Sequence, residues 1–495
     1  MTSSFTRRGF LAAGAALGSL GLLPQLGRAQ SSVLSLVAGT RSLDINGRAA
    51  SVYGLSNGLG GQGLILDPDQ RFQVQLTNAL DVETLIHWHG QIPPNAQDGV
   101  PDMPMAKLKP AETRNYDFAP QPGTHWMHSH IPTQEMQLLA APLIVRSAKD
   151  LAEDRQEVVM FLHDFSFLTP EEVLAQITGG ASMAGMGHDM SGMSHGGDMG
   201  GMDMSAMGHD GMAMPGMAMP GMAMDLNDFN FDAYLTNDRT LADPQVVKVD
   251  IGGRVRLRIV NASAATTYWI DTGGVEAALV AVDGHDVVPI KGRRFGIAMA
   301  QRLDIVLDLP AGQGAFPILA LREGAREQTG LILATAGAAV LRLDDLAAVA
   351  SPAFDLDLAQ ESQLRALVPL PDRAAAKAEM VMLAGSMAPY VWTINGQTWG
   401  SHQPITAKTG DRVELMFHNM SMMGHPMHLH GHAFQVVQIN GTRFAGAVRD
   451  TVYVPPMSQV TIAIDAGEAA RWMLHCHHMP HLATGMMTEF AVQAS

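Results

Sequence analysis

The chain has 495 residues, 47% of them apolar and 16% charged, which excludes a disordered protein and gives a prior of about three domains. Its net charge of −16 disfavours nucleic-acid binding, and its single cysteine excludes disulfide frameworks, cysteine-rich zinc sites and iron–sulfur clusters. Methionine and histidine are frequent, at 34 and 20 residues, and both are unevenly distributed.

The N-terminus has the pattern of an export signal. Arg7 and Arg8 precede the apolar run Phe10–Leu23, and Ala29 offers a small residue for cleavage. This predicts a twin-arginine signal peptide over residues 1–29, and hence delivery to the periplasm by the twin-arginine translocation machinery. A membrane anchor is disfavoured because a spanning helix needs roughly 20 apolar residues and this run has 14. We expect no membrane span in the mature protein.

One eight-residue pattern occurs three times along the chain. It begins with arginine, alternates apolar residues and ends with asparagine, over Arg71–Asn78, Arg254–Asn261 and Arg412–Asn419. Alternation with a period of two predicts a half-buried β-strand each time. The copies lie 183 and 158 residues apart, so each belongs to its own domain. With 50 glycines, 27 prolines and little helical periodicity, the chain predicts an all-β fold of three antiparallel sandwiches.

The predicted domains follow one another after the signal. We assign residues 30–150 to the first domain, 151–345 to the second, 346–378 to a linker and 379–495 to the third. The second domain is interrupted over residues 179–225 by a low-complexity segment that contains 14 methionines and three histidines. This segment has too few branched or aromatic residues to build a core, so we interpret it as an insertion.

The outer domains each contribute two His-x-His pairs. Two of the pairs begin nine residues after the asparagine of the repeat, whereas the same offsets in the middle repeat give Ile270 and Thr272. Side chains alternate along a strand, so each pair places both rings on one face, and four such pairs predict a metal centre. The middle domain is then scaffold. The pairs are His87/His89, His128/His130, His428/His430 and His475/His477.

The single cysteine, Cys476, lies between two of these histidines, and its sulfur points to the opposite face of the strand. His425, His481 and Met486 complete two imidazoles, a thiolate and a thioether, the ligand set of a blue-copper electron-transfer centre. A small buried apolar cysteine is the alternative, and zinc is disfavoured because ten histidines exceed a four-ligand site. The eight remaining imidazoles divide over three coppers, and such a cluster can deliver four electrons to O₂.

These motifs closely resemble the multicopper oxidase family. His87–Gly90, Gly123–His130, His425–Gly431 and His475–Met486 match its four copper signatures in order. The resemblance implies three consecutive cupredoxin-like Greek-key β-sandwich domains, O₂ as the electron acceptor and four copper ions as cofactors. The implied ligands are His425, Cys476, His481 and Met486 for the type 1 copper, His87 and His428 for type 2, His89, His128 and His477 for one type 3 copper, and His130, His430 and His475 for the other.

The resemblance also concerns carboxylates near the cluster. Asp98 lies eleven residues after His87, where the family places an acidic residue, and this implies a role in proton delivery. The competing interpretation is a surface turn residue. Many bacterial members carry a second carboxylate directly after the type 1 histidine. This chain has Leu482 there, so that part of the relay is absent or replaced. Three histidines inside the motifs match no ligand position and are expected beside the ligands or on the surface: His125, His432 and His478.

The distribution of methionines suggests the identity of the electron donor. Thioethers prefer Cu(I), and methionines gather both in residues 179–225 and around His425. This resembles the bacterial copper-tolerance branch, the cuprous oxidases, and implies oxidation of Cu(I) to Cu(II). Branch members commonly carry the Met-rich stretch nearer the third domain, and some have an acidic residue where this chain has Ser421. The candidate Cu(I) contacts are Met422, Met423, Met202, Met204 and Met207.

Two other functions are compatible with the same residues. A laccase-like oxidase of small phenols would use the same coppers, with the Met-rich segment as a lid over the donor site. A copper-sequestering protein would need only the Met-rich segment, and the complete ligand set argues against it. A copper nitrite reductase does not need four His-x-His pairs, and a structural member that has lost its coppers is disfavoured because no ligand is missing.

Overall fold

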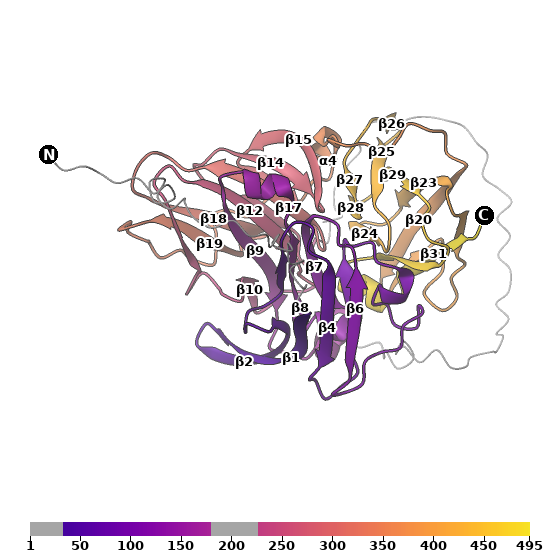
Figure 1. Ribbon diagram of the computed structural model, residues 1–495, viewed down its shortest axis with the longest axis horizontal. Helices are drawn as coiled ribbons and strands as arrows, with labels where there is room; N and C mark the ends of the chain where they lie inside the picture. The colour runs from indigo at the N-terminus through magenta and orange to yellow at the C-terminus, as the bar shows by residue number, and fades with distance from the viewer. Residues whose placement is uncertain (1–32, 180–225) are drawn as a thin grey trace, which may run out of the picture. The chain divides into compact units, whose positions relative to one another are not determined.

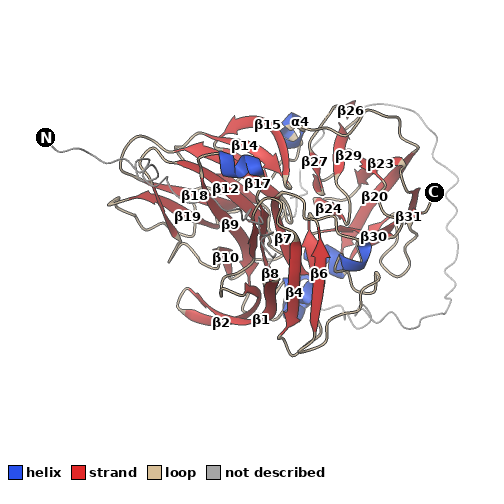
Figure 2. Ribbon diagram, viewed as in Figure 1, coloured by secondary structure: helices blue, strands red, loops and turns tan. Residues whose placement is uncertain are grey.

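The computed structural model describes residues 33–179 and 226–495, and Figure 1 shows their course. Strands dominate the described part, as Figure 2 shows. They pair into six sheets, two for each predicted domain. The predicted all-β class with three sandwich domains is therefore confirmed. The predicted signal peptide, nearly all of the Met-rich segment and the candidate contacts Met202, Met204 and Met207 lie outside the described residues. Among the helices that are described, none is long and apolar enough to cross a membrane.

The first domain consists of two four-stranded sheets, in the orders β2-β1-β4-β6 and β3-β8-β7-β5. Leu36, Trp88 and Leu143 are fully buried between them. The second sheet carries the histidine strands β5 and β7 side by side. The elements are β1 Leu34–Ile45, β2 Arg48–Asn57, β3 Leu64–Leu66, β4 Phe72–Asn78, β5 Ile86–His89, the 3₁₀ turn η1 Asn95–Gln97, β6 Thr113–Phe118, β7 Gly123–Ser129, α1 Pro132–Glu135, β8 Ala140–Val145 and α2 Ala148–Ala152.

The second domain has a six-stranded sheet, β10-β9-β12-β17-β14-β15, and a five-stranded sheet, β11-β19-β18-β13-β16. Ile270, at the position equivalent to a ligand of the outer domains, is fully buried on β13 among apolar side chains. The elements are β9 Gln156–Phe165, α3 Pro170–Ile177, β10 Ala233–Thr236, β11 Val246–Val249, β12 Arg254–Asn261, β13 Tyr268–Asp271, β14 Ala277–Val282, β15 His285–Gly292, β16 Arg294–Ile297, β17 Arg302–Asp308, β18 Ala315–Arg322 and β19 Gln328–Thr335.

The third domain repeats the plan, with the sheets β21-β20-β23-β29-β25-β26 and β22-β31-β30-β24-β28, and β27 paired to β25. The histidine strands β24 and β30 are again neighbours. A helix, α4 Ala359–Gln363, lies in the segment before it. The elements are β20 Lys377–Met387, β21 Tyr390–Ile394, β22 Ile405–Lys408, β23 Arg412–Asn419, β24 His425–Leu429, β25 Phe434–Ile439, β26 Thr442–Arg443, β27 Val448–Arg449, β28 Thr451–Val454, β29 Gln459–Asp465, β30 Arg471–Cys476, α5 Met479–Ala483 and β31 Met487–Gln493.

The three sequence repeats form the equivalent strands β4, β12 and β23, and each strand ends at a fully buried asparagine. Asn78, Asn261 and Asn419 make the same bonds. Each side-chain amide donates to one carbonyl of the loop that follows and to a second carbonyl about 30 or more residues further along the chain, and each Oδ1 accepts the backbone N–H two residues later. The repeated asparagine therefore closes the turn that leads toward the next strand, and in the third domain that strand begins with His425.

The prediction of a half-buried strand is wrong for β12. Seven of its eight residues are buried, including Arg256 and Arg258 on the face expected to meet solvent. Arg258 Nε donates to Glu157 at 2.8 Å and its Nη1 to Asp304 at 3.0 Å. Arg256 Nη1 pairs with Asp150 of α2, at the end of the first domain. The polar face of this strand thus lies in a domain junction, where charges are tolerated because they are paired.

Replacing the repeated asparagine should separate stability from copper binding. Asn261→Ala and Asn419→Ala each leave buried carbonyls without a donor, and we expect the free energy of unfolding to fall by about 1–3 kcal/mol in each case. Only Asn419→Ala should also weaken the blue absorption of the copper-loaded protein, because its loop leads to His425. Urea unfolding and visible spectra measure the two effects. Equal loss of colour in both variants would contradict this assignment.

Candidate copper centres

Three predicted type 1 residues meet in the third domain. His425 begins β24, Cys476 ends β30 and His481 lies in α5. Cys476 Sγ is 3.7 Å from His425 Nδ1 and 3.6 Å from His481 Nδ1, and these two nitrogens are 3.1 Å apart. All three side chains are fully buried. Met486, also buried, is tied to them through the backbone, since its carbonyl accepts the N–H of Cys476 and its own N–H donates to the carbonyl of His481.

Burial sets the charge state of this group. It lowers the pKa of His425 to about 3 and holds the pKa of His481 well below its usual value, so both imidazoles are neutral with a lone pair available. It raises the pKa of the Cys476 thiol, which a coordinating metal ion would deprotonate. Ser421 Oγ lies 2.8 Å from His425 Nε2, so Nδ1 is the nitrogen turned toward the sulfur. A thiolate and two imidazoles fit a copper ion.

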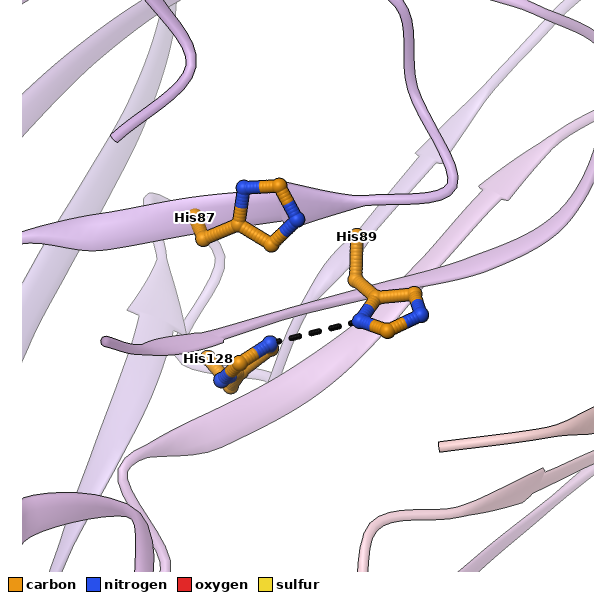
Figure 3. A group of neighbouring side chains, drawn as sticks. All are labelled: His87, His89 and His128. Atoms are coloured by element: carbon orange, nitrogen blue, oxygen red, sulfur yellow. Dashed lines mark hydrogen bonds between the residues drawn. The ribbon is translucent and has the colours of Figure 1, made fainter. Parts of the chain in front are cut away.

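The eight remaining histidines come together from the first and third domains. On β5 and β7, His87 lies opposite His128, and on β24 and β30, His428 lies opposite His475. Figure 3 shows the first-domain group, where His89 Nδ1 is 3.4 Å from His128 Nε2. The other members directly follow the strand ends. All eight are at most 4% exposed: His87, His89, His128, His130, His428, His430, His475 and His477.

The rings of the groups implied by the family resemblance lie close together, and so do rings of different groups, with centroids 3.9 Å apart for His87 and His430 and 3.7 Å for His89 and His428. His430 Nε2 lies 3.2 Å from His130 Nε2 and 3.1 Å from His475 Nε2. In the second triplet, the ring centroids are 5.5 Å apart for His89 and His128, 5.1 Å for His89 and His477, and 5.0 Å for His128 and His477. The rings of the predicted type 2 pair, His87 and His428, have centroids 5.6 Å apart.

Several of these histidines form a hydrogen bond through the outer ring nitrogen, the one that faces away from the cluster. This turns the inner ring nitrogen toward the middle of the cluster. His87 Nδ1 donates to the carbonyl of Asp98 at 2.8 Å, and His428 Nδ1 to the carbonyl of Asp450 at 2.9 Å. The Nε2 atoms of His87 and His428 are buried and have no hydrogen-bond partner within the described residues. Unpaired buried polar atoms are costly, and converging imidazole lone pairs fit metal ions. The residues present therefore fit the implied copper cluster.

A carboxylate that the sequence analysis did not find links the cluster to the second domain. Asp450 Oδ1 lies 3.0 Å from His89 Nε2. Arg302, which begins β17 and is fully buried, donates to the same oxygen at 2.8 Å and pairs with Asp450 Oδ2 as well. No local motif connects Arg302 to the histidines, because it lies in the domain without ligands. The middle domain therefore acts on the cluster through this ion pair.

Asp98 is 1% exposed and directly follows the turn η1, so the surface interpretation is wrong. Its Oδ2 lies 2.9 Å from His430 Nδ1. The surface alternative is also wrong for His125, His432 and His478, which are at most 5% exposed. His432 Nδ1 donates to the carbonyl of His430 at 3.0 Å, and the His478 ring stacks on His481 with centroids 3.9 Å apart. Of the candidate Cu(I) contacts, Met422 is 42% exposed and Met423 is 4% exposed.

A buried site of one cysteine and two imidazoles, next in sequence to a cluster of eight imidazoles, has the residues of a copper protein that would pair an electron-transfer site with a multinuclear centre. Multicopper oxidase family models match residues 38–150, 208–344 and 373–495, which together make up more than half of the chain. The chain belongs to the multicopper oxidase family, whose members are O₂-reducing oxidoreductases with cupredoxin domains.

Comparison with individual proteins gives more distant likenesses. The chain is 28% identical to multicopper oxidase MmcO of Mycobacterium tuberculosis, over 98% of this chain and 96% of that protein. It is 24% identical to copper resistance protein A of Escherichia coli, over 95% and 94%. Among solved structures, Fet3p, a multicopper oxidase that functions in iron import, superposes with a TM-score of 0.72 at 17% identity, over 92% of this chain and 90% of that one.

The position of Asp98 predicts the effect of removing its charge. Asp98→Asn keeps the backbone carbonyl that binds His87 but removes the carboxylate beside His430 Nδ1, so we expect O₂ reduction to slow about 10- to 100-fold, the range for groups that hydrogen-bond to metal ligands. The blue absorption should stay intact, because Asp98 makes no contact with the type 1 residues. Stopped-flow reoxidation of the reduced, copper-loaded protein measures this. An unchanged reoxidation rate would rule out a role for Asp98 in O₂ reduction.

Proposed function

We propose that this protein is a periplasmic multicopper oxidase, exported by the twin-arginine route, that oxidises Cu(I) to Cu(II) with O₂ and so confers copper tolerance. The balanced reaction consumes four Cu(I), one O₂ and four protons, and yields four Cu(II) and two water molecules. The observation that supports Cu(I) as the donor is a group of methionines in the loop that leads to His425.

These methionines lie in the loop between β23 and β24. Met420 is 52% exposed and Met422 is 42% exposed, whereas Met423 is buried two residues before His425. Soft thioether sulfur prefers Cu(I), so the loop offers ligands both at the surface and beside the type 1 residues. The composition of residues 179–225 and the similarity to copper resistance protein A support the same donor.

Four copper ions, when bound, supply one-electron acceptance at type 1 and four-electron reduction of O₂ at the cluster. The proposed holders are those the family resemblance implies: His425, Cys476, His481 and Met486 for type 1, His87 and His428 for type 2, and two triplets for type 3, His89/His128/His477 and His130/His430/His475. Residues of the protein supply the other contributions. Ser421 orients His425, the backbone of His475–His477 joins the two sites covalently, and Asp98 Oδ2 supplies a proton site beside His430 Nδ1.

The donor can be identified by O₂ uptake. We expect fast uptake with Cu(I) as the only donor, with one O₂ consumed for four Cu(I), and slower turnover of a small phenol. Deleting residues 180–224 should lower Cu(I) oxidation while phenol oxidation holds or rises. Fast phenol turnover with little response to Cu(I) would indicate a laccase, which the laccases among the relatives make the second candidate. No uptake with either donor by the copper-loaded protein would indicate sequestration.

The surface methionines allow a second test. In the double variant Met420→Leu/Met422→Leu, we expect the KM for Cu(I) to rise about tenfold, equivalent to about 1.4 kcal/mol of lost binding, because leucine keeps the volume and removes the sulfur. The KM for a phenol should not change. Met380→Leu is a matched control, since Met380 is 52% exposed on β20 in the same domain. Equal effects in the control and the double variant would argue against Cu(I) capture by this loop.

A further inference from the structure

The short helix α1 carries a buried carboxylate to the edge of the cluster. It begins two residues after His130, and Glu135 at its end is 2% exposed. The helix is fixed to the first domain through Gln134, whose side chain accepts from Ser129 Oγ at 2.8 Å and donates to the carbonyl of Glu83 at 2.7 Å. It also contacts β7 of the first domain and α5 of the third. Glu135 thus sits where the two ligand-bearing domains meet.

The two oxygens of Glu135 face two different histidines. Oε2 lies 2.7 Å from His128 Nδ1, and Oε1 lies 3.6 Å from His477 Nδ1. His128 belongs to β7 of the first domain, whereas His477 directly follows β30 of the third. Both belong to the triplet completed by His89. The Glu135 carboxylate therefore faces the Nδ1 atoms of His128 and His477. These two histidines come from different domains and are proposed to bind the same copper.

The atoms on the His477 side lack partners. Glu135 Oε1 and both ring nitrogens of His477 are buried and have no hydrogen bond within the described part of the chain. A buried polar atom without a partner is costly. A metal-ligating imidazole donates its outer N–H, most often to a carboxylate or a carbonyl. Coordination through His477 Nε2 would leave Nδ1 protonated and facing Oε1, so copper and Glu135 together satisfy all three atoms.

Leu482, where the sequence analysis noted that a second carboxylate is absent, does not supply one to this triplet. Leu482, in α5, is 4% exposed and packs in an apolar cluster with Met479, Met487 and Val100. It offers no oxygen to His477. Glu135 approaches the same triplet from the first domain and is 347 positions earlier in the chain.

We propose that Glu135 is a positioning residue for one type 3 copper: its two oxygens hold the outer nitrogens of His128 and His477, fix both rings, and so couple copper binding to the contact between the first and third domains. The inference depends on the copper assignment of the cluster and is independent of whether Cu(I) or a phenol is the donor.

The experiment measures copper retention by the full-length protein. Glu135→Leu removes both oxygens at similar volume, and we expect a 10- to 100-fold weaker affinity at the affected site in competition with a chelator. The copper content should fall below four per chain while the blue absorption remains. Electron paramagnetic resonance should show a new Cu(II) signal, because a coupled pair that loses one copper is no longer silent. Glu135→Gln can accept from only one of the two imidazoles, so its affinity should lie between.

Glu323→Gln is the matched control. Glu323 is a buried glutamate of the second domain that accepts the N–H of Phe354, and it makes no contact with the eight histidines. Its copper content and resonance spectrum should equal those of the unmodified protein. The proposal is overturned if Glu135→Leu binds four coppers with unchanged affinity. If that variant does not fold, Glu135→Gln decides: a severalfold loss of affinity with an unchanged melting temperature of the copper-free protein supports the proposal, and unchanged affinity overturns it.

Discussion

Eight imidazoles share a buried layer between the first and third domains, and the cost of burying them constrains the surrounding structure. Desolvation lowers the pKa of His128, His430, His475 and His477 well below the usual value, so these rings are neutral. A neutral ring still has one donor and one acceptor nitrogen to satisfy. Outer nitrogens of His87, His428 and His475 bond to backbone carbonyls, that of His430 faces a carboxylate, and inner lone pairs are left for metal ions. The ligand-bearing strands are arranged to meet both demands at once.

Strand register separates the two kinds of site. On β24 and β30, the pair His428/His475 lies beside the pair Met427/Cys476. Neighbouring side chains of a strand point to opposite faces, so the rings reach the cluster while Cys476 Sγ reaches the type 1 residues. A shift by one residue would send sulfur to the cluster and imidazole into the apolar core. The covalent connection between electron entry and O₂ reduction therefore depends on the same backbone pairing that holds the sheet together.

The fold and the inner ligands could be predicted because they leave periodic signals. The repeated strands ending in Asn78, Asn261 and Asn419, and the spacing of the His-x-His pairs from those asparagines, reflect local geometry that a sequence records directly. Burial was harder. β12 alternates like a surface strand, yet Arg256 lies in a junction between domains. Alternation shows which residues share a face, but only the packing of domains decides whether that face meets water.

Of the three carboxylates beside the histidines, only Asp98 was predicted, through the family resemblance, and the arrangement of Glu135 and Asp450 explains why those two were not. Asp98 follows a turn of the first domain, Glu135 ends a one-turn helix, and Asp450 lies between two strands of the third domain. Asp98 faces His430, Asp450 faces His89, and Glu135 faces both His128 and His477. Asp450 is itself held by Arg302 of the second domain. A carboxylate that orients a ligand needs only to reach one ring nitrogen, so it can come from any segment that passes nearby. Three domains thus act on one cluster although only two supply its histidines, and the domain without ligands is a structural part of the centre.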